Sequence, residues 1–135
     1  MDLMQSMHVS GSGMSAQSQR IKVISENIAN ADSLQSEEGG PYRRQVMTFK
    51  TELDRQTGLR KVVVDDVYKD QKTPMGHEFN PNHPLADENG FITTPNVNTL
   101  IESSDMRDAQ RSYEANLNAI DTARQMMSRS LDILR

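Results

Sequence analysis

The residues of this chain that are best suited to chemistry are two histidines and two acids in one short stretch. His77 and Glu78 are followed by His83 and Asp87, and such groups can bind a metal ion or exchange a proton. A helical zinc hydrolase needs two histidines four positions apart with a glutamate between them. Here the histidines are six apart, and Pro81 interrupts any helix between them. We therefore expect a turn-rich loop whose polar groups cap its own backbone, with a metal-dependent hydrolase as an alternative.

No other side chain lies in a recognisable catalytic setting. The chain has no cysteine, and it has no Gly-x-Ser-x-Gly turn to present a serine nucleophile. The stretch from Ser10 to Gly13 lacks the lysine and the preceding strand of a phosphate-binding loop, so it reads as a flexible joint. Arg43-Arg44 and Arg60-Lys61 are isolated pairs, typical of a solvated surface. The sequence therefore predicts no catalytic residue, no metal site and no cofactor, and we do not expect an enzyme.

The composition indicates a small core. Only 35% of the 135 residues are hydrophobic, and the chain has three Phe, three Tyr, no Trp and nine Met. An ordinary globular domain has more apolar residues, so either part of the chain is disordered or its apolar surfaces are buried against partners. The net charge of -4 is spread along the chain, and a pI near 5.3 argues against a nucleic-acid partner.

The sequence does not resemble that of a membrane-spanning protein or of a protein with a cleaved secretory signal peptide. The longest strongly apolar run is Val62-Val63-Val64, far below the roughly 18 residues that a membrane helix needs. The first residues, from Met1 to Ser6, lack the cationic and apolar regions of a secretory signal peptide. We expect no membrane insertion and no cleaved signal. Because the chain has no cysteine, it is compatible with both a reducing and an oxidising compartment.

Hydrophobic periodicity predicts one long helix at each end. From Leu3 to about Ala31, apolar residues recur every seven positions. Gly11 and Gly13 each cost about 1 kcal/mol of helix propensity relative to alanine, so we expect a stable helix only from Met14. The piece before Met14 is expected to be helical only when docked. A second helix is predicted over residues 97–134, with one seven-residue row, a row beside it and a face of small residues that a neighbouring helix could approach closely. These three rows are Met106, Tyr113, Ile120, Met127 and Leu134; Gln110, Leu117, Arg124 and Leu131; and Ala109, Asn116, Ala123 and Ser130.

In the middle of the chain the hydrophobic residues no longer follow the seven-residue repeat of the two helices. Residues 42–53 and 61–68 read as short strands, because they are rich in alternating or β-branched side chains. Residues 72–98 contain four prolines and two glycines and read as a loop, either extended over a partner or unfolded alone. We expect a mainly α fold in which long terminal helices pack as a coiled-coil-like pair around a small irregular β/loop middle. The predicted parts are an N-terminal helix in 1–33, the middle segment in 34–96 and a C-terminal long helix in 97–135.

The second helix is too long to be covered within the chain. It would reach about 57 Å at about 1.5 Å per residue, more than the diameter of a small domain. Two such helices bury one stripe in each other and leave the small-residue face of the second helix uncovered, which favours external partners over a closed helical domain. The side chains of three asparagines are candidates to set the register between subunits, as a polar residue does in a coiled coil. The predicted assembly interface is Met14, Ile21, Ile24, Asn27, Ile28, Asn30, Met106, Tyr113, Asn116, Leu117, Ile120, Met127, Leu131 and Leu134.

A string at the end of the first helix resembles a known signature. The run from Val23 to Ser33 (VISENIANADS), preceded by Gly13-Met14 and Arg20, is similar to that of flagellar basal-body rod and hook axial proteins. Further matches resemble the proximal-rod members of this family and extend to the C-terminal helix. They are Gly39 to Arg44, Asn82-His83-Pro84, Ala86-Asp87, Gly90, Pro95 to Asn98, Asp105-Met106 and Tyr113 to Asn116.

This resemblance implies a structural subunit of the bacterial flagellar rod, whose terminal helices line the axial export channel and transmit torque. It also implies export without a cleaved signal through the flagellar type III apparatus, and assembly in the periplasmic space of the basal body. The implied partners are proximal and distal rod subunits, the MS-ring/rod junction protein FliE and further copies of the chain. The competing hypothesis is a soluble coiled-coil adaptor or secretion chaperone, which would also have long amphipathic helices and no active site.

Overall fold

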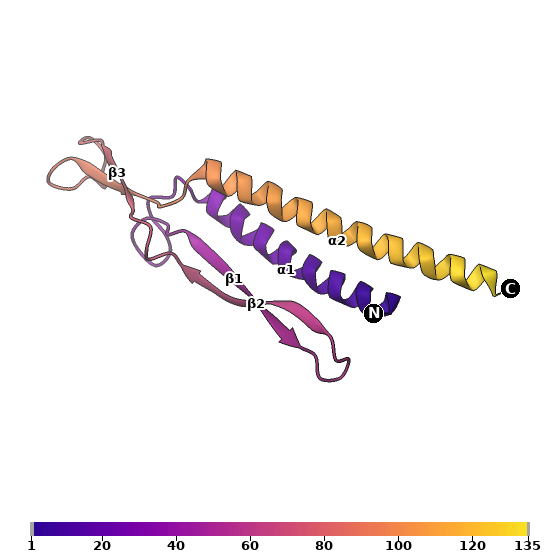
Figure 1. Cartoon of the computed structure of the whole chain (residues 1–135). Helices are drawn as coiled ribbons and strands as arrows, with labels where there is room; N and C mark the ends of the chain where they lie inside the picture. Colours follow the sequence, from indigo (N-terminus) through magenta and orange to yellow (C-terminus); the bar gives the residue numbers. More distant parts are fainter. Residues whose placement is uncertain (1, 135) are drawn as a thin grey trace.

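Two long antiparallel helices form the body of the molecule in a computed structural model that describes residues 2–134. α1 spans Leu3–Ala29 and α2 spans Thr99–Ile133, and both chain ends lie at the same end of the pair (Figure 1). Between the helices the chain forms two antiparallel hairpins. The predicted arrangement of two long terminal helices around a small β middle is confirmed.

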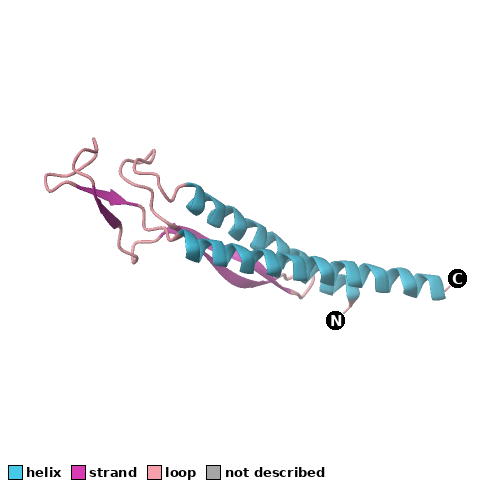
Figure 2. Cartoon of the chain, turned by 90° about the horizontal axis from the view of Figure 1, so that it is seen from above, coloured by secondary structure: helices cyan, strands magenta, loops and turns pink. Residues whose placement is uncertain are grey.

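α1 is helical through its glycine-bearing part as well. It lies between α2 and the first hairpin (Figures 1 and 2), so both neighbours contact its N-terminal half. The Ser12 hydroxyl donates to the carbonyl of Val9 at 2.7 Å and accepts from the amide of Val62, on that hairpin, at 3.2 Å. α1 ends at Ala29 and not near Ala31, because the Asn30 side chain donates to the carbonyl of Glu26 and caps the helix.

The two helix glycines are expected to respond differently to alanine. A Cβ on Gly11 would meet no atom within 4 Å, whereas a Cβ on Gly13 would lie 2.9 Å from Nδ2 of Asn116 on α2. Gly11→Ala should therefore raise the free energy of unfolding by about 0.5–1 kcal/mol through helix propensity alone. Gly13→Ala should gain less or lose stability, because Asn116 must shift. Thermal melts followed by circular dichroism test this pair, and equal stabilisation by both changes would contradict the close approach at Gly13.

The face of α2 that packs on α1 carries the small residues. Ala109 is 0% exposed, Ala123 is 4% exposed, and Asn116 lies against Gly13. The row of Met106 is half-buried beside them as far as Met127, and its last member, Leu134, is exposed. The expectation that the small-residue face stays uncovered was wrong, because its small side chains let α1 of the same chain approach closely. The remaining row points away from α1, and all of its members are exposed: Gln110, Leu117, Arg124 and Leu131.

The first hairpin pairs β1 (Gln45–Leu53) with β2 (Arg60–Lys69), in good agreement with the predicted strands. Its register shifts once, between Thr48 and Phe49. The second hairpin pairs β3 (Gly76–Phe79) with β4 (Phe91–Thr94) at the end of the molecule opposite the chain termini (Figure 1). We expected residues 72–98 to be a loop with no regular element longer than a few residues, and the structure adds that two strands of four residues pair there. Strands of four residues between prolines are too short for a period to be visible in the sequence.

The apolar core is as thin as the composition indicated. The buried apolar side chains are Ala16, Val23, Ile24, Ile92, Ala109 and Ala123. Much of the remaining buried volume is polar, because Asn27 and Glu102 are each 1% exposed. Within residues 2–134 no helix is long and apolar enough to cross a membrane.

Candidate functional site

The most highly organised site of the molecule is a polar cluster where the helices meet the hairpins, and it begins with Asn27 on α1. The Asn27 carboxamide donates to the carbonyl of Gln45 at 2.9 Å and accepts from the amide of Gln45 at 2.9 Å. It also accepts from the Tyr42 hydroxyl at 2.8 Å and donates to the Glu102 carboxylate at 3.2 Å. All four hydrogen-bonding positions of the side chain are filled. Asn27 thus pairs with the first residue of β1 as a neighbouring strand would.

Glu102 brings α2 into the same cluster. Its side chain is 1% exposed, and its second carboxylate oxygen accepts from Nε of Arg44. A buried carboxylate is stable only when it is paired and hydrogen-bonded, and Glu102 has both the arginine and Asn27. Arg44 also lies 3.9 Å from Asp105 and 3.6 Å from Asp70, so one guanidinium faces three carboxylates.

Asp70 and Asn96 bring the two remaining chain crossings to the cluster. The Asn96 side chain accepts from the amide of Arg44 at 2.7 Å and donates to the carbonyls of Asp70 at 3.2 Å and Thr73 at 3.1 Å. The Asp70 carboxylate accepts from the Thr73 hydroxyl at 2.6 Å and from the amides of Lys72 and Thr73. We call Asn27, Arg44, Asp70, Asn96 and Glu102 the polar junction. It ties together every connection between the helix pair and the two hairpins.

The electrostatics of the polar junction favour its charged state. Burial acts to lower the pKa of Arg44, but its hydrogen bond to Glu102 and the surrounding carboxylates outweigh burial and raise the pKa. Hydrogen bonds from the side chain and amide of Thr73 and the amide of Lys72 lower the pKa of Asp70 to about 2, with a contribution from Arg44. Arg44 and Asp70 are therefore both charged at neutral pH, where their ion pair helps to hold the hairpins to the helices.

The low pKa of Asp70 predicts a loss of stability in acid. The pKa falls from its ordinary value of 3.8 to about 2 in the folded chain, so Asp70 stabilises the fold above about pH 4 and loses this contribution as the pH falls towards 2. Asp70→Asn should lower the melting temperature at pH 7, and the difference from the unchanged chain should shrink between pH 4 and pH 2. Thermal melts across that range test the prediction, and a difference that does not depend on pH would contradict it.

The two histidines do not come together as a metal or catalytic site. His77 is exposed on β3, whereas Nδ1 of His83 accepts from the amide of Leu85 in the following turn. Asp87 accepts from the amides of Asn89 and Phe91, so its carboxylate also caps a turn. Within residues 2–134 no group of three His, Cys, Asp or Glu side chains is placed to hold a metal ion.

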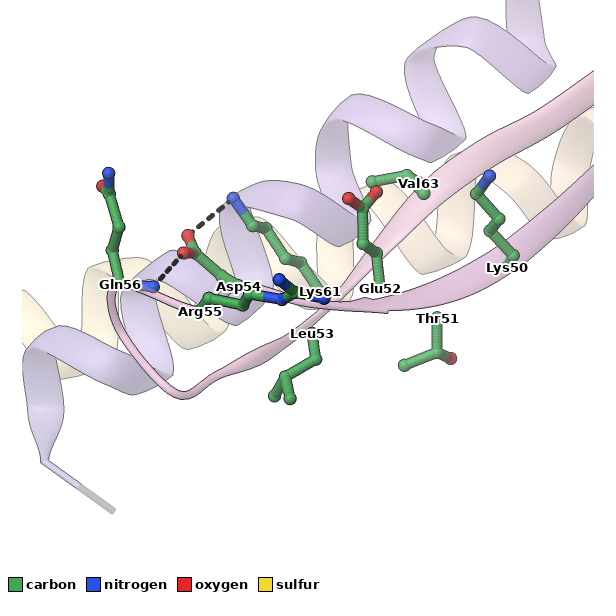
Figure 3. A pocket seen from close by; sticks show the side chains of 9 residues that line it. All are labelled: Lys50, Thr51, Glu52, Leu53, Asp54, Arg55, Gln56, Lys61 and Val63. Carbon is green, nitrogen blue, oxygen red and sulfur yellow. Dashed lines mark hydrogen bonds and ion pairs between the residues drawn. The ribbon is translucent and has the colours of Figure 1, made fainter.

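A shallow hollow at the tip of the first hairpin holds paired charges (Figure 3). Its side chains alternate along β1, with Lys50 and Glu52 on one side of the ribbon and Thr51 and Leu53 on the other. Across the turn, Asp54 accepts from Lys61 at 2.8 Å, and this bond together with the amide of Gln56 lowers the pKa of Asp54 to about 2. The hollow contains no histidine, serine or cysteine. Its paired charges hold the turn closed.

The predicted assembly residues fall into three groups by exposure. Ile24 and Asn27 are buried inside the chain, and Leu117, Leu131 and Leu134 are 40%, 65% and 84% exposed. The half-buried members are Met14, Ile21, Ile28, Asn30, Met106, Tyr113, Asn116, Ile120 and Met127. The three predicted register asparagines all bond within the chain, since Asn30 bonds to Glu26 and Ser33, and Asn116 bonds to Ser112.

Most of the polar junction was missed by reasoning from the sequence. Glu102 could have been found, because it lies in the seven-residue row that contains Ala109, Asn116 and Ala123, where an acid interrupts the face of small residues. Arg44 and Asn96 lie in stretches that resemble the family, but no pattern linked them to each other or to Asp70, because the three lie far apart along the chain and meet only through tertiary contacts.

Known proteins resemble this chain over almost its whole length. The family described as "Flagella basal body rod protein" matches residues 7–33, and the family described as "Flagellar basal body rod FlgEFG protein C-terminal" matches residues 88–133. A flagellar basal-body rod protein FlgC of Agrobacterium fabrum is 44% identical, covering 94% of this chain and 91% of that protein. Proteins of the same description are 35% identical in Escherichia coli, over 98% of both chains, and 37% identical in Borreliella burgdorferi, over 100% of this chain and 99% of the other. The chain therefore belongs to the FlgC family of flagellar basal-body rod proteins, and it is a structural subunit of the rod and not an enzyme.

Proposed function

We propose that α1 and α2 form the inner axial layer of the rod and line its export channel, while the two hairpins form an outer layer that transmits torque between subunits. In residue terms, 1–33 and 97–135 make the inner domain, and 34–96 make the outer segment. The rod family implies association with further copies and with other rod components. The polar junction then holds the two layers together within each subunit.

A single observation carries this proposal: α1 covers the rows of Ala109 and Met106 on α2, but the leucines of the row between Gln110 and Leu131 stay exposed. The row of Ala109 and Ala123 is buried on α1, whereas Leu117 and Leu131 face outward. The buried row and the neighbouring Met106 row alternate at spacings of three and four, which supports coiled-coil-like packing of the pair. Helical polymerisation would cover the outward row, and this supplies the apolar burial that the single chain lacks.

The same proposal places the predicted interface residues in the polymer. Leu117, Leu131 and Leu134 contact neighbouring subunits directly, because they are exposed on one helix. The nine half-buried residues of the predicted interface lie along the edges of the contact between α1 and α2 and determine the shape of the helix pair there. Ile24, Asn27 and Asn30 act from within the chain, by holding α1 against α2 and β1.

The proposed partners are proximal and distal rod subunits, the MS-ring/rod junction protein FliE and the flagellar type III export apparatus. The chain is exported without a cleaved signal peptide and assembles where the rod crosses the periplasmic space. No nucleic acid, membrane insertion or cofactor enters this function.

The test uses an epitope-tagged full chain in cells that lack the native gene. The tagged chain should restore swimming and appear in purified hook-basal bodies. Leu117→Asp should leave export intact, reduce incorporation into the rod at least tenfold and abolish swimming, because it places a charge in the outward apolar row. The matched control, Asn118→Asp, adds the same charge at the next exposed position and should swim normally. A tagged chain that stays in the cytoplasm as a small closed oligomer would instead establish the adaptor or chaperone hypothesis.

A further inference from the structure

The first hairpin has one strand edge that the chain itself leaves open. On β2, the amide of Val62 donates to the Ser12 hydroxyl at 3.2 Å, so α1 covers the outer edge of that strand. On β1, the outer edge is bonded to α1 only at its start, where Gln45 meets Asn27. Within residues 2–134, no hydrogen bond joins the outward backbone groups of residues 47–53 to another part of the chain. Such an open edge is a template for a further strand.

The alternation of the strand decides which backbone groups of β1 point outward. Val62 pairs with Thr51, and the Val62 amide points away from β1, so the amide and carbonyl of Thr51 point away from β2. Gln45, which bonds outward to α1, lies six positions earlier and therefore belongs to the same alternating series. In the open part of the strand, the outward positions are Phe49, Thr51 and Leu53.

The charges of β1 select one register when this edge meets a second, antiparallel copy of itself. Outward groups must face outward groups, so the centre of the pairing falls on a residue and not between two residues. Centring on Lys50, Glu52 or Leu53 would place two like charges opposite each other, which destabilises a sheet. Centring on Phe49 would place both charges opposite uncharged residues. Centring on Thr51 places Lys50 of each copy opposite Glu52 of the other.

The same register also joins the apolar side chains. Lys50 and Glu52 lie on one side of β1, and Leu53 lies on the other (Figure 3). Phe49 shares the side of Leu53 by alternation, and the two side chains are 36% and 56% exposed. Pairing centred on Thr51 places Phe49 of each copy opposite Leu53 of the other. On the charged side, Lys50 already lies 3.2 Å from Asp65 and gains Glu52 of the other copy as a second partner.

We propose that two copies of the free chain pair through the open edge of β1, antiparallel and centred on Thr51, to form a four-stranded sheet. The occupant is a second copy because the charge pattern of β1 is complementary to itself. Backbone hydrogen bonds, opposite charges and apolar contacts all use this one register. The pairing stands independently of the proposed function.

The consequence for assembly does rest on the proposed function. A two-fold contact uses the same surface on both copies and closes on itself. Neighbours in a helical polymer are instead related by a rotation and a shift along the axis. The pair therefore cannot be built into the rod as it stands, and it must separate before a subunit is incorporated. The dimer covers the open edge of β1 while the subunit is free.

A single cysteine tests the register in the purified full chain. The chain has no cysteine, so Thr51→Cys can form a disulfide only with another copy. Opposite residues of a hydrogen-bonded antiparallel pair have Cα atoms about 5.5 Å apart, within the range of about 4.4–6.8 Å that disulfides span. Under mild oxidation with copper phenanthroline, Thr51→Cys should crosslink at least about tenfold faster than Thr93→Cys, an exposed position on β4.

Charge reversal tests the partner. Lys50→Glu and Glu52→Lys each place like charges opposite each other and should raise the dissociation constant of the dimer at least about tenfold in sedimentation velocity. The two changes together restore opposite charges and should return the constant to within about threefold of the unchanged chain. The double variant still lacks the pair between Lys50 and Asp65, so its recovery cannot come from contacts within one copy.

The possible results separate the pairing from the proposed function. An unchanged chain that stays monomeric across the dilution series, equal crosslinking by the two cysteine variants, or a double variant that does not recover would each overturn the pairing. Presence of the tagged chain in basal bodies measures the rod assignment separately. A monomeric chain that incorporates would overturn the pairing alone, and a pairing chain that never incorporates would overturn the proposed function alone.

Discussion

Replacing Asn27 by leucine should lower the free energy of unfolding by about 3–5 kcal/mol, because it removes four hydrogen bonds at once. The variant leaves the amide and carbonyl of Gln45, the Tyr42 hydroxyl and one oxygen of Glu102 without their partner. Leucine has the same number and branching of side-chain heavy atoms and is not smaller, so the loss comes from unpaired polar groups and not from a cavity. Urea unfolding followed by circular dichroism at 222 nm measures the effect.

Two comparisons make the Asn27 prediction specific. Asn118→Leu makes the same chemical change on the exposed side of α2 and should alter stability by less than about 0.5 kcal/mol. Asn30→Ala removes two half-buried hydrogen bonds, to Glu26 and Ser33, and should cost about 1–2 kcal/mol. In cells, Asn27→Leu should also reduce swimming, since β1 is no longer held to α1. A loss no larger than that of Asn30→Ala would contradict the central role of Asn27.

Replacing Arg44 by methionine should have an effect of similar size, through charge. Glu102 is 1% exposed and would be left as a buried carboxylate without its cation, which typically costs about 3–5 kcal/mol. Lys50→Met breaks the ion pair between Lys50 and Asp65, in which both side chains are about half exposed. It should lower the free energy of unfolding by about 1 kcal/mol or less. Urea unfolding of both variants measures the difference between a buried and an exposed ion pair.

A double-mutant cycle tests whether the Arg44 effect arises from Glu102. Removing both charges, with Arg44→Met and Glu102→Leu together, leaves no uncompensated carboxylate at that position. The double variant should therefore lose clearly less stability than the two single losses combined, with a coupling of about 1–3 kcal/mol. Additive losses would show that Arg44 stabilises the fold through Asp70 and Asp105 alone, or through packing of its alkyl chain.

Both predictions concern the same mechanical question, how the hairpins are attached to the helix pair. The chain crosses between these parts before β1, after β2 and before α2, and each crossing is bonded to the polar junction. A rod subunit that bears torque across its layers needs these crossings to resist rotation. Hydrogen-bonded charged groups supply directional restraint that the few buried apolar residues cannot.

The long helices and the first hairpin were predictable because their patterns are local. A seven-residue repeat over more than thirty positions defines α2 without knowledge of its neighbours, and the β-branched run of β2 defines a strand in the same way. The second hairpin was not predictable. Its strands are four residues each, and their pairing depends on the turns between Asn80 and Gly90 that bring them together.

The sequence by itself determined two amphipathic helices, the absence of a recognisable catalytic motif and the family string from Val23 to Ser33, because each depends on residues close together in the chain. Only the tertiary structure decided that the small-residue row of α2 packs on α1, where Gly13 lies against Asn116 and Ala109 is fully buried. It also decided that Asn27 bonds within the chain and that Arg44, Asp70, Asn96 and Glu102 surround it. These groups are up to 75 positions apart, and only the folded arrangement brings their charges and hydrogen bonds together.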